Sequence, residues 1–567
     1  MNDTSGTALT RPKRWDSPFD PNLQQVELGT LLRIPEIAAI DASAFPRSLP
    51  LEGILRNDCR FIHRQSGEII IREGDYGSSA FLLVRGSAKA VLPPGVPLEQ
   101  LGRQQSKTKS RWEAFSQLWK NSRQPEARDV SRYQKKEAGI AMKGRAEGLG
   151  TVFIDRQEAA GPNLREILPT LATQPLPQGS LFGEIAALRR EPRSASVVAD
   201  SQCLLLEIRW QGLRDIRKYD NGWQQIIDQS YRRNTLFTHL SEHPLFANLN
   251  KQALEKVAAA TRFENYGSFE WFNEFQQRGV DSIQTDQEPV VAAEGEYSDG
   301  LLLIAAGFGR VTVKTGNGQR TVTYLRSGDC YGLEEFLLNR ETGQNPGYQS
   351  SLYATGYLDV LRVPGHALEE IVNELKSLPQ ANFSALAAKP IDESDDLLEW
   401  AVSERFINGT QTMLIDLNKC VRCDDCVRAC SRAHDGNPRF IRQGQVLDGY
   451  MVANACMHCN DPVCLIGCPT GAIHRTTEQG IVTINDETCI GCGVCANSCP
   501  YNNIRLVEIN DSQGKEIVDP DTSLPITKAT KCDLCAEQRG GPACVRACPT
   551  NAMSRLDFHQ LNQFAGR

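Results

Sequence analysis

The spacing of cysteines near the end of the chain constrains its fold more than any other feature. Sixteen of the nineteen cysteines in this 567-residue sequence lie between Cys420 and Cys548. A disulfide framework would be a short, secreted chain with cysteines spread along it, which this sequence is not. The cluster therefore predicts metal ligands. The sixteen candidates form four groups: Cys420, Cys423, Cys426 and Cys430; Cys456, Cys459, Cys464 and Cys468; Cys489, Cys492, Cys495 and Cys499; Cys532, Cys535, Cys544 and Cys548.

The spacing within the groups is that of iron–sulfur ligands. Soft thiolate sulfur is the ligand that iron–sulfur clusters select. Three cysteines on one tight loop can reach three iron atoms, and we expect the fourth to begin a helix that leads to a neighbouring cluster. Zinc sites pair two distant CxxC elements and do not use such CxxCxxC runs. A [3Fe–4S] cluster would need a group that lacks one cysteine, and no group here lacks one. Sixteen thiols shared four to a cluster give four [4Fe–4S] clusters with none left over.

The residues around these cysteines resemble a known family. Residues 412–556 are similar to the four-cluster ferredoxin-type electron-transfer subunits of molybdopterin oxidoreductases of the dimethyl-sulfoxide-reductase type. The matching stretches are Met413–Asp416, Ala455–Cys459, Cys468–Ala472 and Lys531–Cys535. The resemblance implies that the first and fourth groups share two clusters and that the second and third share the other two. The implied ligand sets are Cys420, Cys423, Cys426 and Cys548; Cys532, Cys535, Cys544 and Cys430; Cys456, Cys459, Cys464 and Cys499; Cys489, Cys492, Cys495 and Cys468.

A chain of four clusters favours electron transfer over catalysis. The sequence contains no GxGxxG nucleotide fingerprint and no hydrolytic motif, so we expect a non-catalytic subunit whose redox partner performs the substrate chemistry. The resemblance implies a molybdopterin oxidoreductase catalytic subunit as that partner. The alternative is a redox- or oxygen-sensing signalling protein, for which one or two exposed clusters would suffice. We interpret His434, His458 and His474, which lie near the cysteines in sequence, as surface or supporting groups.

Two β-rich modules precede the cysteines. Short apolar runs separated by glycine turns are typical of an antiparallel sandwich or barrel, and the weak repeat of these signals suggests two copies of one module. The expected fold is two β-jelly-roll modules with flanking helices, followed by an α+β polyferredoxin of two interleaved bacterial-ferredoxin-like repeats. The expected ranges are an N-terminal arm (1–50), a first module (51–237) with an insertion (103–147), a second module (238–378), a linker (379–411) and a ferredoxin domain (412–560).

The first module resembles the cyclic-nucleotide-binding domain. The resemblance is carried by Gly179–Leu188 and Glu191–Val197. The residues implied to contact the nucleotide are Gly183, Glu184, Arg193, Ser194 and Ala195. A helix starting near the glycine offers amides to a phosphate, the arginine supplies a planar charged fork, and the glutamate can accept from the ribose hydroxyl. The small residues let the backbone approach the phosphate closely. The implied ligand is cAMP or cGMP; the alternative is a fold that keeps this motif without binding a ligand.

The second module departs from this motif where the charge is required. The stretch 328–335 is similar to the start of the motif, but Pro346–Ser351 contains no arginine. Hydrogen bonds to charged groups contribute about 1.5–3 kcal/mol each, so a site without its arginine would bind a cyclic phosphate poorly. We therefore interpret this copy as degenerate, with a structural or docking role. We expect Cys59, Cys203 and Cys330 to be buried small hydrophobes.

The insertion at 103–147 contains twelve Lys or Arg residues against five acidic ones, with Trp112, Phe115 and Trp119 among them. It is either a basic arm for a partner or a solvated insertion. We favour the solvated insertion because lengthening a surface loop costs little free energy of folding. The net charge of the sequence is −7, and four clusters of about −2 each would bring it to roughly −15. This negative charge and the absence of a helix-turn-helix argue against nucleic-acid binding. The sequence shows neither an export signal nor an apolar run of ~18 residues, which predicts a cytoplasmic protein without a membrane span.

Overall fold

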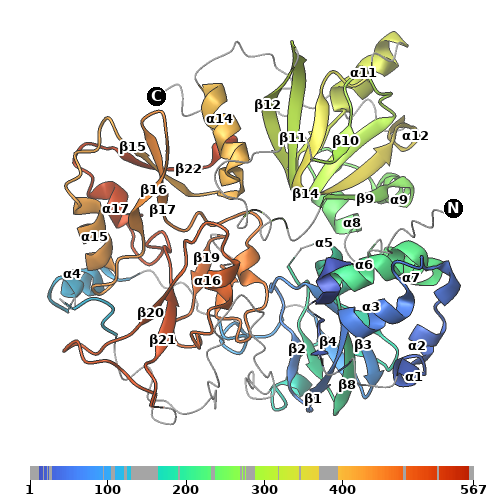
Figure 1. Cartoon of the computed structure of the whole chain (residues 1–567), viewed down its shortest axis with the longest axis horizontal. Coiled ribbons are helices and arrows are strands. Elements are labelled where there is room, and N and C mark those ends of the chain that lie inside the picture. The colour runs from blue at the N-terminus through green and yellow to red at the C-terminus, as the bar shows by residue number, and fades with distance from the viewer. Residues whose placement is uncertain are drawn as a thin grey trace, which may run out of the picture. The chain divides into compact units, whose positions relative to one another are not determined.

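The computed structural model separates the chain into two compact units, which Figure 1 shows in ribbon form. One unit comprises Met1–Leu101 and Ala160–Thr238, and the other comprises Gly102–Ala159 and His239–Arg567. The structure describes residues 12–16, 18–21, 23, 28–92, 95–103, 109–120, 124–128, 164–189, 192–231, 236–267, 271, 275, 288–316, 318–343, 347–369, 394–476, 480–519 and 523–560. Among these residues, no helix is both long enough and apolar enough to cross a membrane.

The first unit is built around two four-stranded antiparallel sheets. Their strand orders are β1-β8-β3-β6 and β2-β7-β4-β5. The inner faces of the sheets bury Phe81, Leu83, Val197 and Leu205 in one core, as the alternation of apolar residues along the strands requires. The strands are β1 (Cys59–Arg64), β2 (Ile69–Ile71), β3 (Ser79–Arg85), β4 (Ala88–Val91), β5 (Thr173–Leu176), β6 (Leu181–Phe182), β7 (Val197–Ala199) and β8 (Cys203–Arg209).

Residues before the sheets are also packed into this unit. Asp58, which is fully buried, accepts hydrogen bonds from Arg14 and Arg209, and Ile37 is fully buried as well. The described residues of the expected N-terminal arm are therefore held in the unit by ion pairs and apolar contacts. The helices are η1 (Lys13–Asp16), α1 (Leu28–Leu31), α2 (Pro35–Ala38), η3 (Ala42–Ala44), α3 (Leu51–Asp58), η5 (Leu168–Thr170), α5 (Glu184–Arg189), α6 (Trp210–Tyr219) and α7 (Asn221–Tyr231).

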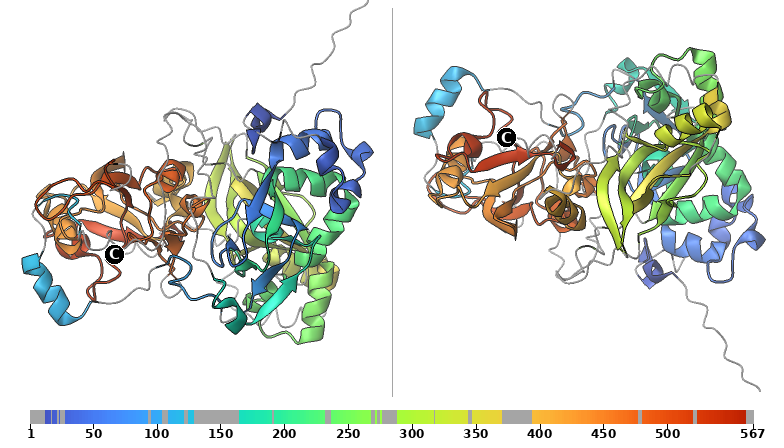
Figure 2. Two further views of the ribbon diagram at one scale, coloured as in Figure 1. Left: turned by 90° about the horizontal axis from the view of Figure 1, so that it is seen from below. Right: turned by 90° about the horizontal axis from the view of Figure 1, so that it is seen from above.

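The second unit contains a six-stranded antiparallel sheet whose long strands β11 and β14 run side by side (Figures 1 and 2). Its core buries Leu302, Ile304, Leu352 and Val360. The strands are β9 (Arg262–Gly267), β10 (Val290–Ala292), β11 (Gly300–Thr315), β12 (Gly318–Arg326), β13 (Cys330–Tyr331) and β14 (Ser351–Pro364). The accompanying helices are α8 (Phe237–Glu242), α9 (Lys251–Ala260), α11 (Leu333–Thr342) and α12 (Gly365–Leu368).

One hydrophobic core joins this β-rich module to the cysteine region. Phe308 and Tyr324 from the module pack with Phe406 and Leu414. Part of the range expected as a linker contributes to this core, because it folds into α14 (Ser394–Ser403) and η10 (Phe406–Asn408). The second module and the cysteine region are therefore a single folded unit. Cys59, Cys203 and Cys330 are buried, as expected.

The cysteine region contains one four-stranded sheet, of order β16-β17-β15-β22, and two small hairpins, β18-β19 and β20-β21. The strands are β15 (Thr412–Asp416), β16 (Ile441–Leu447), β17 (Tyr450–Asn454), β18 (Ile473–Arg475), β19 (Val482–Ile484), β20 (Arg505–Glu508), β21 (Thr527–Thr530) and β22 (Met553–Leu556). The helices are α15 (Asp425–Ala433), η11 (Val463–Leu465), α16 (Val494–Ser498), α17 (Ala543–Arg546) and η12 (Phe558–Gln560).

Candidate metal centre and nucleotide site

Short helices carry the later cysteines of the groups. Cys426 and Cys430 both lie within α15, and α16 contains Cys495 and is followed by Cys499 as its C-cap. The expectation that the fourth cysteine begins a helix is therefore wrong, since each helix begins just before the third cysteine of its group. The fourth cysteine lies within the helix, at its C-cap or, as with Cys468 and Cys548, beyond its end. Four helical residues advance the backbone by about 6 Å, which separates the fourth thiol from the first three.

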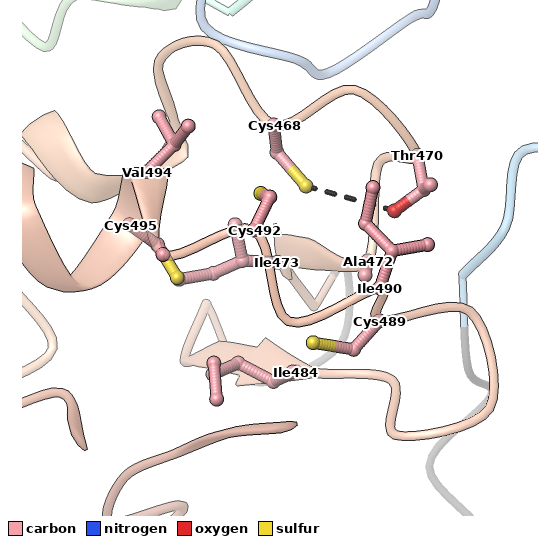
Figure 3. Close-up of a pocket in the computed structure, with 12 residues that line it drawn as sticks. Cys468, Thr470, Ala472, Ile473, Ile484, Cys489, Ile490, Cys492, Val494 and Cys495 are labelled. Atoms are coloured by element: carbon pink, nitrogen blue, oxygen red, sulfur yellow. Dashed lines mark hydrogen bonds between the residues drawn. The ribbon is translucent and has the colours of Figure 1, made fainter. Parts of the chain in front are cut away.

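The structure gathers cysteines from different groups around shared spaces. Cys468 of the second group lies with three cysteines of the third group around one cavity, and the four side chains point toward it (Figure 3). Apolar side chains, including Ile473 and Ile484, line the rest of this cavity. The four thiols, Cys468, Cys489, Cys492 and Cys495, are one of the implied ligand sets. We call the two sets shared by the second and third groups the inner sets, and the two shared by the first and fourth groups the outer sets.

Cys430 of the first group lies beside three cysteines of the fourth. Burial raises the pKa of the Cys430 thiol, and the nearby thiols of Cys532, Cys535 and Cys544 raise it further. The backbone N–H of Arg439 donates to Cys430 Sγ at 3.2 Å. These neighbours are the implied partners of Cys430 in an outer cluster.

The second inner set is gathered in the same way. Burial raises the pKa of the Cys464 thiol, with further contributions from Cys499, Cys456 and Cys459. Cys499 belongs to the third group, so the second and third groups exchange their fourth cysteines, as the resemblance implies.

The remaining ligand set is Cys420, Cys423, Cys426 and Cys548. Cys420 and Cys548 both pack against the buried cluster that contains Cys426. The side chain of Arg428 donates to the carbonyl oxygen of Cys423, the fourth member, at 2.8 Å.

The donor chemistry of these sites fits [4Fe–4S] clusters. Backbone N–H groups donate to Cys499, Cys535 and Cys548 Sγ at 3.4, 3.5 and 3.2 Å, and such donors stabilise thiolate charge and adjust a cluster's potential. Burial raises the pKa of Cys535 to about 12, so this thiol is protonated until a metal binds it. Assembly at such sites releases protons.

His458 and His474 are buried and His434 is half-buried, so none of the three histidines is an exposed surface group. His434 Nε2 lies 3.5 Å from Cys535 Sγ and 3.3 Å from the Asp533 carboxylate. Burial lowers the pKa of His434 to about 4. His458 and His474 are almost inaccessible to solvent. Sequence reasoning did not place His434 at Cys535, because the two are 101 residues apart.

The described part of the basic insertion packs on the cysteine region. The backbone N–H of Lys109 donates to the Glu537 carbonyl at 2.9 Å, and that of Arg128 donates to the Asn510 carbonyl at 2.7 Å. Our interpretation as a solvated insertion is therefore wrong for this part, while residues 129–147 lie outside the described residues. On helix α4 (Arg111–Lys120), Trp112 remains 81% exposed.

Arg193 occupies the centre of the candidate nucleotide site. Its guanidinium donates to the carbonyl oxygen of Ser79 at 2.6 Å and to that of Gly183, and it lies 5.8 Å from the Phe81 ring. A Cβ at Gly77 or Gly183 would overlap the guanidinium, so a larger residue at either position would displace Arg193 from its present contacts. A buried, charged fork is thus held inside the sandwich, where an anionic phosphate would be a stronger acceptor than a carbonyl.

The other candidate residues lie in the same turn region between β6 and β7. Gly183 has a φ of +76°, which places Glu184 at the start of α5 with its side chain buried. Ser194 is exposed and Ala195 is half-buried. The structure therefore brings the five predicted residues to one place.

Backbone hydrogen bonds identify the equivalent position in the second module. The backbone of Arg193 accepts a hydrogen bond from the N–H of residue 74 and donates one to the carbonyl of residue 75. The backbone of Tyr348 makes the corresponding two bonds with residues 295 and 296. The Tyr348 ring is buried and lies 5.2 Å from that of Tyr331. Leu333 begins α11 as Glu184 begins α5. Uncharged side chains thus replace both charged ones in this copy.

Two protein-family models match the chain. The 4Fe-4S dicluster domain matches residues 447–557, and the cyclic nucleotide-binding domain matches residues 171–220. The first range contains the second, third and fourth cysteine groups, and the second contains Arg193. These matches confirm both resemblances.

Curated relatives match about a quarter of the chain. The electron transport protein HydN of Escherichia coli K12 is 34% identical over 166 residues, which are 27% of this chain and 91% of that protein. The thiosulfate reductase electron transfer subunit PhsB of Salmonella typhi is 33% identical over 178 residues, 28% of this chain and 84% of that protein. Among solved structures, the regulatory domain of Toxoplasma gondii PKA with cAMP has a TM-score of 0.21 and 14% identity, covering 63% of this chain and 95% of that chain.

Proposed function

Because the chain belongs to the family of 4Fe–4S dicluster electron-transport proteins, we propose that it carries electrons through four [4Fe–4S] clusters to or from a partner oxidoreductase. The exchange of cysteines between groups supports this proposal most strongly. Cys430 lies with the fourth group and Cys468 with the third, so each of these cysteines ties one proposed cluster to the loop of its neighbour. When bound, each cluster takes up and releases one electron.

The protein's own residues hold and insulate this path. The proposed ligand sets are the four that the resemblance implies, from Cys420 to Cys548. Apolar walls such as those around Cys468 exclude water, and backbone N–H groups stabilise the thiolates. The architecture we propose is two interleaved ferredoxin-like repeats behind two jelly-roll modules.

We propose a molybdopterin-type catalytic subunit as the redox partner. The name of the relative PhsB describes an electron transfer subunit of thiosulfate reductase, which supports a partner of the oxidoreductase class. The substrate chemistry then belongs to that partner.

The first sandwich is proposed to regulate this transfer by binding a cyclic nucleotide. Arg193 would contact the phosphate and Glu184 the ribose hydroxyl. The second copy, with Tyr348 and Leu333 in their places, serves as a structural module that shares a core with the cysteine region. We propose that the chain exchanges between two arrangements that differ in electron transfer. A nucleotide can shift this equilibrium only if it binds the two arrangements with different affinity. The insertion connects the sandwich to the cysteine region along the chain, because it follows β4 and precedes β5 in sequence while its described part packs on the cysteine region. Nucleotide binding could act on the cysteine region through this connection.

Potentiometric titration followed by EPR tests the electron-transfer proposal. Anaerobically purified full-length protein should show four cubane clusters that are reduced and reoxidised reversibly. Fewer than four clusters, or clusters that do not cycle, would contradict the proposal. One or two reversible clusters would instead favour the redox-sensing alternative.

A further inference from the structure

A half-buried arginine lies between two of the proposed clusters. Arg555 lies on β22, opposite Met413 of β15. Its Nη2 donates to Cys532 Sγ at 3.0 Å, and its Nη1 lies 3.4 Å from the Cys456 carbonyl oxygen. Its Nε is inaccessible to solvent. Cys532 and Cys456 belong to different ligand sets, one outer and one inner, so a single guanidinium faces both.

The contact with sulfur distinguishes Arg555 from other cations near the cysteines. Lys528 donates to the Cys489 carbonyl at 2.6 Å, and Lys531 donates to the Cys532 carbonyl at 2.9 Å. These lysines contact the backbone, whereas Arg555 places a charged N–H donor directly on a ligand atom. Hydrogen bonds from ionised donors are roughly twice as strong as neutral ones.

We propose that Arg555 raises the reduction potentials of the two clusters that it faces, acting most strongly on the Cys532 cluster and more weakly on the Cys456 cluster. This inference rests on the proposed function and its ligand sets. Reduction adds one electron, and therefore one negative charge, to a cluster. A nearby positive charge and an N–H···S bond both favour the reduced state, and low solvent access limits their screening. Arginine stays protonated throughout, so the step needs no proton transfer.

A purely structural role is the competing explanation. Arg555 Nη1 also donates to the Gln411 carbonyl at 2.8 Å, so the side chain helps to hold the loop before β15. Loss of that contact would lower stability, but it would not change the potentials of two clusters and leave the other two unchanged. The midpoint potentials therefore separate the two roles.

Arg428 provides a matched control. Its Nη2 donates to the Cys423 carbonyl at 2.8 Å, beside another ligand set, but its side chain is 56% exposed. Water screens an exposed charge strongly. Removing this arginine should leave all four potentials close to those of the wild-type protein.

The experiment is EPR-monitored potentiometry on the full-length holoprotein and its variants. Arg555→Gln should lower two of the four midpoint potentials by unequal amounts, Arg555→Lys should lower them less, and Arg428→Gln should lower none. Four intact clusters with unchanged potentials in Arg555→Gln, or an equal shift in Arg428→Gln, would overturn the proposal. If Arg555→Gln fails to assemble its clusters, Arg555→Lys decides: lowered potentials support the proposal, while unchanged potentials or failed assembly overturn it. Failure of the proposed function itself would appear separately, as fewer than four clusters in the wild-type protein.

Discussion

Replacing Arg193 tests whether the first sandwich is a nucleotide receptor. In Arg193→Ala, a cyclic phosphate would lose two hydrogen bonds from a charged fork, each with a contribution of about 1.5–3 kcal/mol. The guanidinium already donates to the carbonyls of Ser79 and Gly183, so binding exchanges acceptors rather than creating new bonds. The lower end of the range therefore applies, about 3 kcal/mol in total, which corresponds to about 100-fold weaker binding.

Isothermal titration calorimetry with cAMP and with cGMP measures this effect. Arg193→Lys keeps the positive charge but not the planar fork, and we expect its affinity to lie between those of the wild-type protein and Arg193→Ala. Arg85→Ala removes an exposed arginine from the same sandwich and should bind like the wild-type protein. Thermal unfolding of each variant shows whether the sandwich is still folded.

The reasoning fails if the wild-type protein and Arg193→Ala give equal results. Equal, negligible heat would reduce the first sandwich to a scaffold. Equal, measurable binding would place the ligand away from Arg193.

Three further perturbations test the fold and the ligand sets. Asp58→Ala leaves two half-buried arginines without their shared buried carboxylate, and chemical denaturation should show the first unit destabilised by about 3–5 kcal/mol. As a control, Asp41→Ala at an exposed cap should cost no more than ~1 kcal/mol. Cys430→Ser should remove the cluster of the fourth cysteine group by EPR, and loss of the first group's cluster instead would contradict the proposed interleaving. Burial by itself would raise the pKa of Glu264, but hydrogen bonds from Arg362 and Tyr266 and the nearby positive charges together lower it. The stabilising contribution of the Glu264 carboxylate is therefore present above the unfolded pKa of about 4.3 and is lost as pH falls. Unfolding measured against pH should therefore be flatter below about pH 5 in Glu264→Gln.

The cysteine chemistry could be predicted from sequence because it is local. The ligand spacing in each group is set by a few residues of backbone, so the metal type follows from the sequence without knowledge of the fold. The position of the helices did not follow, because helix α15 contains both Cys426 and Cys430. The expectation placed a helix start at the fourth cysteine, whereas one short helix carries the chain from one proposed cluster to the next.

The replacement of Arg193 by Tyr348 could not be read from sequence. The helix in this region has six residues in the first module and ten in the second, so the two motifs fall out of register before the critical position. Backbone hydrogen bonds restore the correspondence. The sequence predicted the missing arginine but not the tyrosine that occupies its position.

Long-range packing explains the remaining differences. The basic insertion is contiguous with the first module in sequence, yet its contacts are with Glu537 and Asn510, more than 350 residues away. No local pattern encodes such a partner. The same holds for His434, which meets Cys535 only in the folded chain.

The number of iron atoms per chain tests the central claim most directly. Iron and sulfide analysis of the anaerobically purified full-length protein, combined with Mössbauer spectroscopy, reports both the amount and the type of cluster. Four four-iron clusters predict about 16 iron atoms per chain, all with [4Fe–4S] spectra. About twelve iron atoms or fewer in fully loaded protein, or a signal from another metal at these cysteines, would contradict the four-cluster path.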